Sequence, residues 1–99
     1  MNRNNFPALE QFLGGYFHQD FLLDYGTPNE AIATFAREEP AKSVRAVCGE
    51  LDRVLLLIRQ DRENPQRVLQ ELGCYYDPAG DGVTITDWLE HVRKELECK

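Results

Sequence analysis

One stretch in the middle of the chain constrains the fold more than any other feature. From Pro40 to about Gln60, apolar residues recur at the spacing that an α-helix places on one face. That face comprises Val44, Val47, Cys48, Leu51, Val54, Leu55 and Ile58. Leu56 and Leu57 lie outside it, and a helix that is apolar on several sides usually packs at the centre of a bundle. Alternatively, the additional leucines form an exposed patch that binds a partner.

Further helices are predicted before this stretch. Phe6-Pro7 begins the first, because proline is favoured in the first turn of a helix. Thr27-Pro28-Asn29-Glu30 is a capping box, in which the Thr27 hydroxyl accepts from the Glu30 amide. The expected inward-facing residues are Leu9, Phe12, Leu13 and Tyr16 in the first helix, and Ile32, Phe35 and Ala36 in the second. Gly14 and Gly15 lie off the first face, where they either admit a close neighbour or mark a point at which the helix loosens.

Two more helices are predicted after it. Asn64-Pro65 begins a short helix that Gly73 ends in the left-handed conformation, and Thr84 or Thr86 caps the last one. Their expected inner faces are Val68, Leu69 and Leu72, then Ile85, Trp88, Leu89, Val92 and Leu96. Residues 74–82 are dense in turn formers and predict a loop. The sequence therefore predicts an all-α, compact single-domain bundle of about five helices over residues 1–99.

Charge is unevenly distributed along the 99 residues, whose formal net charge is −6. Residues 10–39 and 71–99 are acidic, and residues 40–70 carry a small excess of bases. An acidic surface repels phosphates, which disfavours direct nucleic-acid binding, and it attracts a basic partner. The alternative is that the acidity serves only solubility.

Cysteine usage and hydropathy bear on the compartment. Cys48, Cys74 and Cys98 are odd in number and form no CxxC pair, so we expect three reduced thiols in a cytosolic protein. The first five residues lead into no apolar stretch of the kind found in signal peptides. The longest apolar run, Val54–Ile58, is far shorter than the ~20 residues that span a membrane.

Few residue patterns suggest catalysis or metal binding. His18-Gln19-Asp20 could support acid–base chemistry, but no partnered nucleophile is visible, and His91 is the only other histidine. Asp77, Asp81 and Gly82 fit positions of a calcium loop, whereas Ala79 and Trp88 stand where two further ligands are needed. We therefore expect no catalytic residue, no metal and no cofactor.

Tyr75-Tyr76 beside Asp77 is a different kind of pattern. Tyrosine is enriched at the energetic centres of protein interfaces, and nearby carboxylates would suit a basic partner. The alternative is that one tyrosine packs in the core and the other has no specific role.

Three motifs in this order resemble a known family. They are the segment from Phe12 to Phe21, the segment from Tyr25 to Ala31, and the stretch from Leu72 through Asp77-Pro78 and Gly82 to Leu89. Together they are similar to the CdiI-type immunity proteins of contact-dependent growth inhibition systems, over about residues 6–96. The family more often has Trp where this chain has Phe21. The resemblance implies a cytosolic, non-enzymatic protein that binds the toxic C-terminal domain of a CdiA-type protein. Such toxins are often nucleases, frequently ribonucleases.

Candidate contact residues follow from charge, aromaticity and expected exposure. A nuclease holds a polyanion in a basic cleft, so an acidic inhibitor can occupy that cleft. The candidates are Asp20, Asp24, Tyr25, Tyr75, Tyr76, Asp77 and Asp81. Two other hypotheses are a non-enzymatic acidic helical adaptor for another basic protein and a small enzyme that uses His18 and Asp20.

Overall fold

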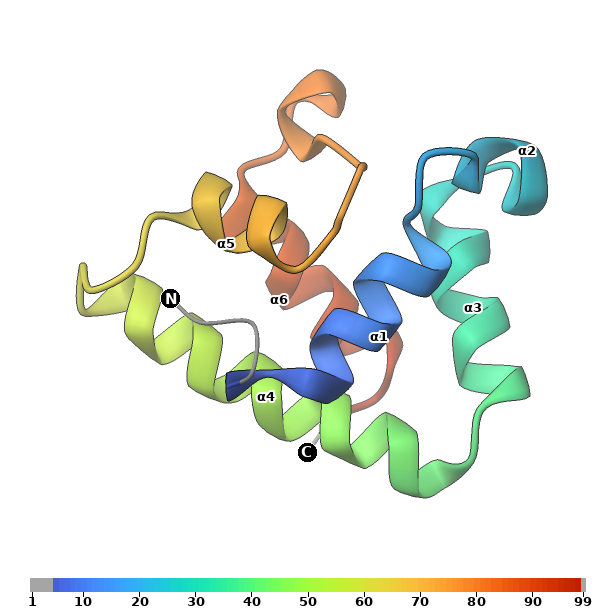
Figure 1. Cartoon of the computed structure of the whole chain (residues 1–99), viewed down its shortest axis with the longest axis horizontal. Helices are drawn as coiled ribbons and strands as arrows, with labels where there is room; N and C mark the ends of the chain where they lie inside the picture. Colours follow the sequence, from blue (N-terminus) through green and yellow to red (C-terminus); the bar gives the residue numbers. More distant parts are fainter. Residues whose placement is uncertain (1–4, 99) are drawn as a thin grey trace.

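The computed structural model describes residues 5–98, and within them the chain is all-α, as predicted. Its elements are α1 (Pro7–Tyr16), α2 (Phe21–Tyr25), α3 (Pro28–Glu38), α4 (Ala41–Arg59), α5 (Pro65–Glu71), the 3₁₀ turn η2 (Pro78–Asp81) and α6 (Ile85–Glu95). Figure 1 shows their arrangement. The five expected helices are present. The additional one, α2, has only 5 residues, which is too short for apolar periodicity to reveal it.

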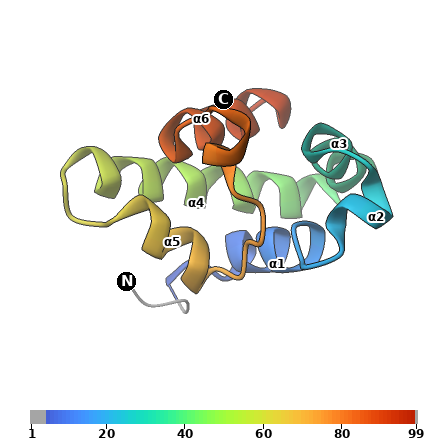
Figure 2. The ribbon, with the colours of Figure 1, turned by 90° about the horizontal axis from the view of Figure 1, so that it is seen from above.

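The long helix α4 is central, as its apolar pattern predicts. Helices α1 and α6 both pack against it, and Figure 2 shows them on different sides of it. Val47, Leu51, Val54 and Leu55 are buried in the core. Leu57 also packs against the core, so the central position is confirmed for that leucine, whereas Leu56 is 53% exposed.

Aromatic side chains make up much of the core between α1 and α3. Phe12 contacts Phe17 and Phe35, with ring centroids 5.6 and 4.4 Å apart respectively. The prediction for α3 was wrong at Ala36, which is exposed, while Ala31 is buried. The α3 face that packs inward is therefore rotated toward Ala31, Ile32 and Phe35.

The predicted helix caps are confirmed. The Thr27 hydroxyl accepts from the Glu30 amide at 3.1 Å, and the Asn64 side chain accepts from the amides of Gln66 and Arg67. Thr84, rather than Thr86, caps α6. Each side chain satisfies backbone donors that the first helical turn leaves unpaired.

Gly14 and Gly73 allow α1 and the end of α5 to approach closely. Gly73 has a φ of 79°, the left-handed conformation predicted for it. A Cβ added there would lie 3.6 Å from the Gly14 Cα, so Gly14 does face a close neighbour. Gly15 has no such neighbour.

The N-terminus of α1 is capped from a distant part of the chain. Phe6 precedes the helix and provides no side-chain cap. Instead, the buried carboxylate of Glu50 on α4 accepts from the amides of Leu9 at 2.8 Å and Ala8 at 3.2 Å. A negative charge at a helix N-terminus is favourable because it meets the positive end of the helix dipole.

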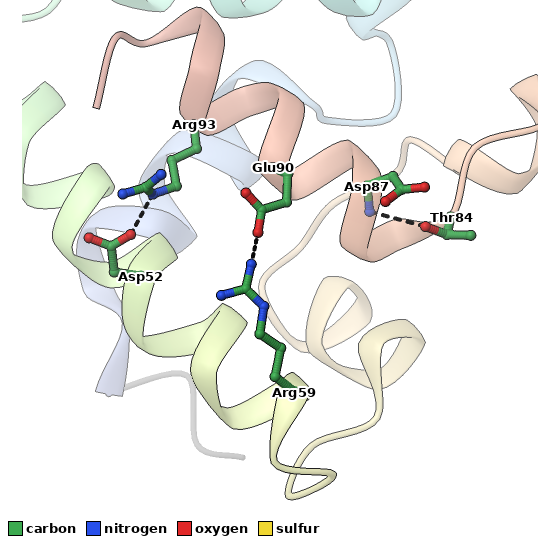
Figure 3. Close-up of polar contacts among 6 residues, drawn as sticks. All are labelled: Asp52, Arg59, Thr84, Asp87, Glu90 and Arg93. Carbon is green, nitrogen blue, oxygen red and sulfur yellow. Dashed lines mark hydrogen bonds and ion pairs between the residues drawn. The ribbon is translucent and has the colours of Figure 1, made fainter. Parts of the chain in front are cut away.

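Polar contacts fix how α6 lies on α4. Arg93 pairs with Asp52 and Arg59 with Glu90, as Figure 3 shows together with the Thr84 cap. The residue number rises along α4 while that of its partner falls along α6, so the two helices are antiparallel.

This antiparallel packing overturns part of the cysteine prediction. Cys48 on α4 and Cys98 just after α6 form a disulfide with Cα atoms 5.5 Å apart. They are 50 positions apart in sequence, and only the packing of α6 on α4 brings them together. The expectation of three reduced thiols is therefore wrong for Cys48 and Cys98, and it holds for Cys74, which is free.

In the described part of the chain, no helix combines the length and the apolar character that crossing a bilayer requires.

Candidate functional site

The loop between α5 and α6 (residues 72–84), here called the late loop, is anchored on the segment that joins α1 to α2. The Tyr75 amide donates to the Phe17 carbonyl oxygen at 2.8 Å. The Tyr76 ring lies between Phe21, at a centroid distance of 5.8 Å, and Trp88, at 5.0 Å. These contacts place the late loop and α2 on the same side of the molecule, the upper side in Figure 1.

Tyr76 and Asp81 interact directly. The Tyr76 hydroxyl donates to Asp81 Oδ2 at 2.7 Å. Burial, and then this hydrogen bond to a carboxylate, raise the pKa of Tyr76 to about 12. Asp77 has a local structural role, because its side chain accepts from the Ala79 amide and caps η2. Tyr75 is 65% exposed beside them.

The other predicted residues surround α2. His18 Nε2 lies 2.9 Å from the Asp24 carboxylate, and His18 Nδ1 accepts from the Asp20 amide at 3.1 Å. The carboxylate that contacts His18 is therefore that of Asp24, whereas Asp20 contributes its backbone. The Tyr25 ring stacks on Tyr16 at 5.6 Å, and burial followed by the Asp24 charge raises the pKa of Tyr25.

A pocket of about 350 Å³ lies beside the late loop. Its lining comes from the start of α3, the late loop and α6: Thr27, Pro28, Asn29, Tyr76, Asp81, Val83, Trp88 and His91. His91 Nε2 lies 2.8 Å from Asn29 Oδ1 across it. The pocket thus joins the Thr27 capping box to the Tyr76–Asp81 pair.

The segments that build this side carry carboxylates and no lysine or arginine. Neither residues 5–36 nor residues 68–92 contain a lysine or arginine. Asp20, Asp24, Asp77 and Asp81 are all exposed there. The side that they form, with Tyr75 and Tyr76, is called the acidic face below. Its negative potential attracts basic partners.

Comparisons with protein families and with solved structures identify the family of this chain. The CdiI immunity protein family matches residues 5–96. The chain belongs to this family. Among curated proteins, none matches significantly. A chain of the solved structure titled "Crystal structure of CdiA-CT/CdiI complex from Y. kristensenii 33638" is similar, with a TM-score of 0.80 and 26% identity. The match covers 92% of this chain and 97% of that chain.

Membership of this family bears on the catalytic hypothesis. CdiI immunity proteins are not enzymes, so the hypothesis of a small enzyme using His18 and Asp20 does not hold. Among the described residues, no cluster of three or more His, Cys, Asp or Glu side chains could hold a metal ion.

Sequence reasoning missed several residues of this side. The sequence predicts capping roles for Thr27 and Asn29 and a core position for Trp88, but it does not predict that all three line one pocket. The α2 side chains Leu22 and Leu23 are 56% and 86% exposed beside the candidate acids. These leucines follow Phe21 in an apolar run, and such a run normally predicts buried rather than exposed side chains.

Proposed function

We propose that this CdiI-family protein binds and neutralises the C-terminal toxin domain of a CdiA-type protein. We also propose that this toxin is a nuclease, and specifically a ribonuclease. The similarity over 92% of the chain to a chain from a CdiA-CT/CdiI complex carries the proposal. Because this chain belongs to the immunity family, CdiI is its counterpart in that complex.

The acidic face supports a nuclease as the target. A nuclease binds a polyanion, so its cleft is normally basic. Carboxylates such as Asp20 and Asp77 can occupy that cleft in place of phosphates. Opposite charges also speed encounter, toward about 10⁸ M⁻¹s⁻¹ for steered pairs. The same acidity disfavours direct contact with nucleic acid.

We propose that the acidic face supplies the toxin contacts, in a one-to-one complex. The contact residues are Asp20, Asp24, Tyr25, Tyr75, Tyr76, Asp77 and Asp81. A standard interface covers about 800 Å² on each partner, which is larger than the area of a few side chains. The exposed Leu22 and Leu23 lie where they can add apolar contact area within it.

The protein acts in the cytoplasm in this proposal, without a cofactor and without a membrane. The cytoplasm keeps thiols reduced. Protection against the toxin therefore has to persist when the Cys48–Cys98 disulfide is open. A double variant, Cys48→Ser with Cys98→Ser, should still protect cells.

Co-expression with the toxin domain encoded directly upstream tests the function. We expect survival of cells that express both proteins, and co-purification as a one-to-one complex. A toxin domain from an unrelated CdiA-type protein is the control, against which no protection is expected. Death of cells in which both cognate proteins are soluble would refute the proposal.

A charge-reversal pair tests the acidic face separately. Asp20→Lys with Asp77→Lys changes two of its acids, and Asp61→Lys with Glu97→Lys makes the same net change at exposed positions elsewhere. We expect the first variant to associate with the toxin at least about tenfold more slowly at low salt, and the second to stay near wild type. Equal rates for the two variants would show that the acidic face is not the contact surface.

A further inference from the structure

The pocket beside the late loop has largely apolar walls and contains one carboxylate, that of Asp81. Pro28, Val83, Tyr76 and Trp88 supply carbon and ring atoms to its wall. The two aromatic rings have centroids 5.0 Å apart. Asp81 is the only Asp or Glu in the lining, and no lysine or arginine is among the lining residues.

The polar groups of the pocket are paired in a way that leaves the Asp81 charge available. Asn29 Oδ1 is engaged by His91 Nε2 at 2.8 Å. Asp81 Oδ2 accepts the Tyr76 hydroxyl at 2.7 Å, which fixes the orientation of the carboxylate. An ionised carboxylate has about four acceptor positions, so most of its capacity remains.

The size of the pocket suits one side chain. Its volume of about 350 Å³ lies near the lower end of the ~300–1,000 Å³ range of small-ligand sites. The pocket also adjoins the acidic face, because Tyr76 and Asp81 line it together with the start of α3. A group that enters it would come from a partner bound to that face.

We propose that this pocket receives a basic side chain, an arginine in particular, from the toxin domain. This inference rests on the proposed function and names the anchor of that interface. A guanidinium ion forms charge-assisted hydrogen bonds with a carboxylate and packs against aromatic rings, and Asp81 with the half-buried Tyr76 provides both partners. Trp88 is only 3% exposed, so it lines the pocket without offering an open ring face. Arginine is also among the residues that dominate the binding energy of interfaces, and a basic nuclease surface supplies it.

Two isosteric variants test the anchor in the complex. Asp81→Asn removes the charge but keeps an oxygen that can accept from Tyr76. Asp87→Asn makes the same change on α6 outside the pocket lining. We expect Asp81→Asn to raise the Kd for the upstream-encoded toxin domain by at least about tenfold, and Asp87→Asn to leave it within about twofold. Equal Kd values would overturn the inference.

A titration without the toxin separates this inference from the proposed function. Trp88 is the only tryptophan in the chain, so its indole N–H resonance reports on the pocket. N-acetyl-arginine methylamide should shift that resonance in a saturable manner, and the uncharged norleucine analogue should not. The shift should be lost in Asp81→Asn and retained in Asp87→Asn.

The outcomes distinguish the two proposals. If the toxin domain does not bind wild-type protein but the arginine probe does, the proposed function fails and the cation pocket remains. If the toxin binds wild type and Asp81→Asn equally, or if the norleucine probe shifts Trp88 as the arginine probe does, the pocket assignment is wrong.

Discussion

The buried carboxylate of Glu50 should be one of the largest single contributions to the stability of this fold. It accepts from two backbone amides in the first turn of α1, those of Leu9 at 2.8 Å and Ala8 at 3.2 Å. The preceding Phe6 offers no cap of its own. Removing the carboxylate in Glu50→Ala therefore leaves both donors without an acceptor at a helix end that packs on α4.

The magnitude follows from these two bonds. A hydrogen bond to a charged group contributes about 1.5–3 kcal/mol, and the favourable helix dipole interaction is included in that figure. Leu9 is fully buried, whereas Ala8 is half-buried and water can replace part of its lost bond. We expect Glu50→Ala to lower the free energy of unfolding by about 3 kcal/mol, or the Tm by about 12–24 °C for a domain of this size.

Urea unfolding followed by circular dichroism measures this change. Glu50→Gln keeps one acceptor oxygen but loses the charge, so its effect should be intermediate, at about 1–2 kcal/mol. Glu95→Ala removes an exposed carboxylate from α6 and should change stability by no more than about 0.5 kcal/mol. A loss of less than about 1 kcal/mol in Glu50→Ala would refute the assignment of Glu50 as the α1 cap.

Three further predictions concern other parts of the fold. The pKa values of Tyr16 and Tyr76 are raised from 10.0 to about 12, so the folded state holds these protons more tightly than the unfolded state. The free energy of unfolding should therefore fall as the pH rises from 10 to 12, which urea unfolding together with phenolate absorbance measures. Opening the 50-residue Cys48–Cys98 loop in the double serine variant should lower the free energy of unfolding by about 2–4 kcal/mol in non-reducing buffer; no change would contradict a constraint on the unfolded chain. Gly73→Ala places a Cβ in the left-handed region and should cost about 1–2 kcal/mol, measured by thermal unfolding; a stabilised variant would contradict this.

Local chemistry made the helices of this chain predictable. The caps at Thr27, Asn64 and Thr84 satisfy backbone donors within three residues, so sequence alone indicates them, although it leaves Thr84 and Thr86 as alternatives for α6. The left-handed turn at Gly73 is equally local. The short helix α2 escaped prediction because its 5 residues span little more than one turn.

Features that depend on how helices pack could not be predicted in this way. The disulfide requires the antiparallel contact of α4 with α6, and Glu50 reaches α1 from 41 positions away along the chain. Ala36 was assigned inward by periodicity, but neighbouring helices decide which edge of an apolar stripe is covered.

The same distinction between local features and packing applies to the candidate site. Acidic residues and tyrosines could be selected from the sequence by residue type and expected exposure. Their grouping could not, because Tyr76 reaches Phe21 and Trp88 only through the packing of the late loop. The pocket combines α3, the late loop and α6, so no single segment of sequence indicates it.

Titration of the toxin domain with this protein, followed by the toxin's cleavage of RNA, tests the central claim most directly. The account predicts that cleavage falls linearly with added protein and is abolished at one equivalent, as expected for tight one-to-one occlusion of a ribonuclease. Cleavage that persists at a large excess of correctly folded protein would contradict it.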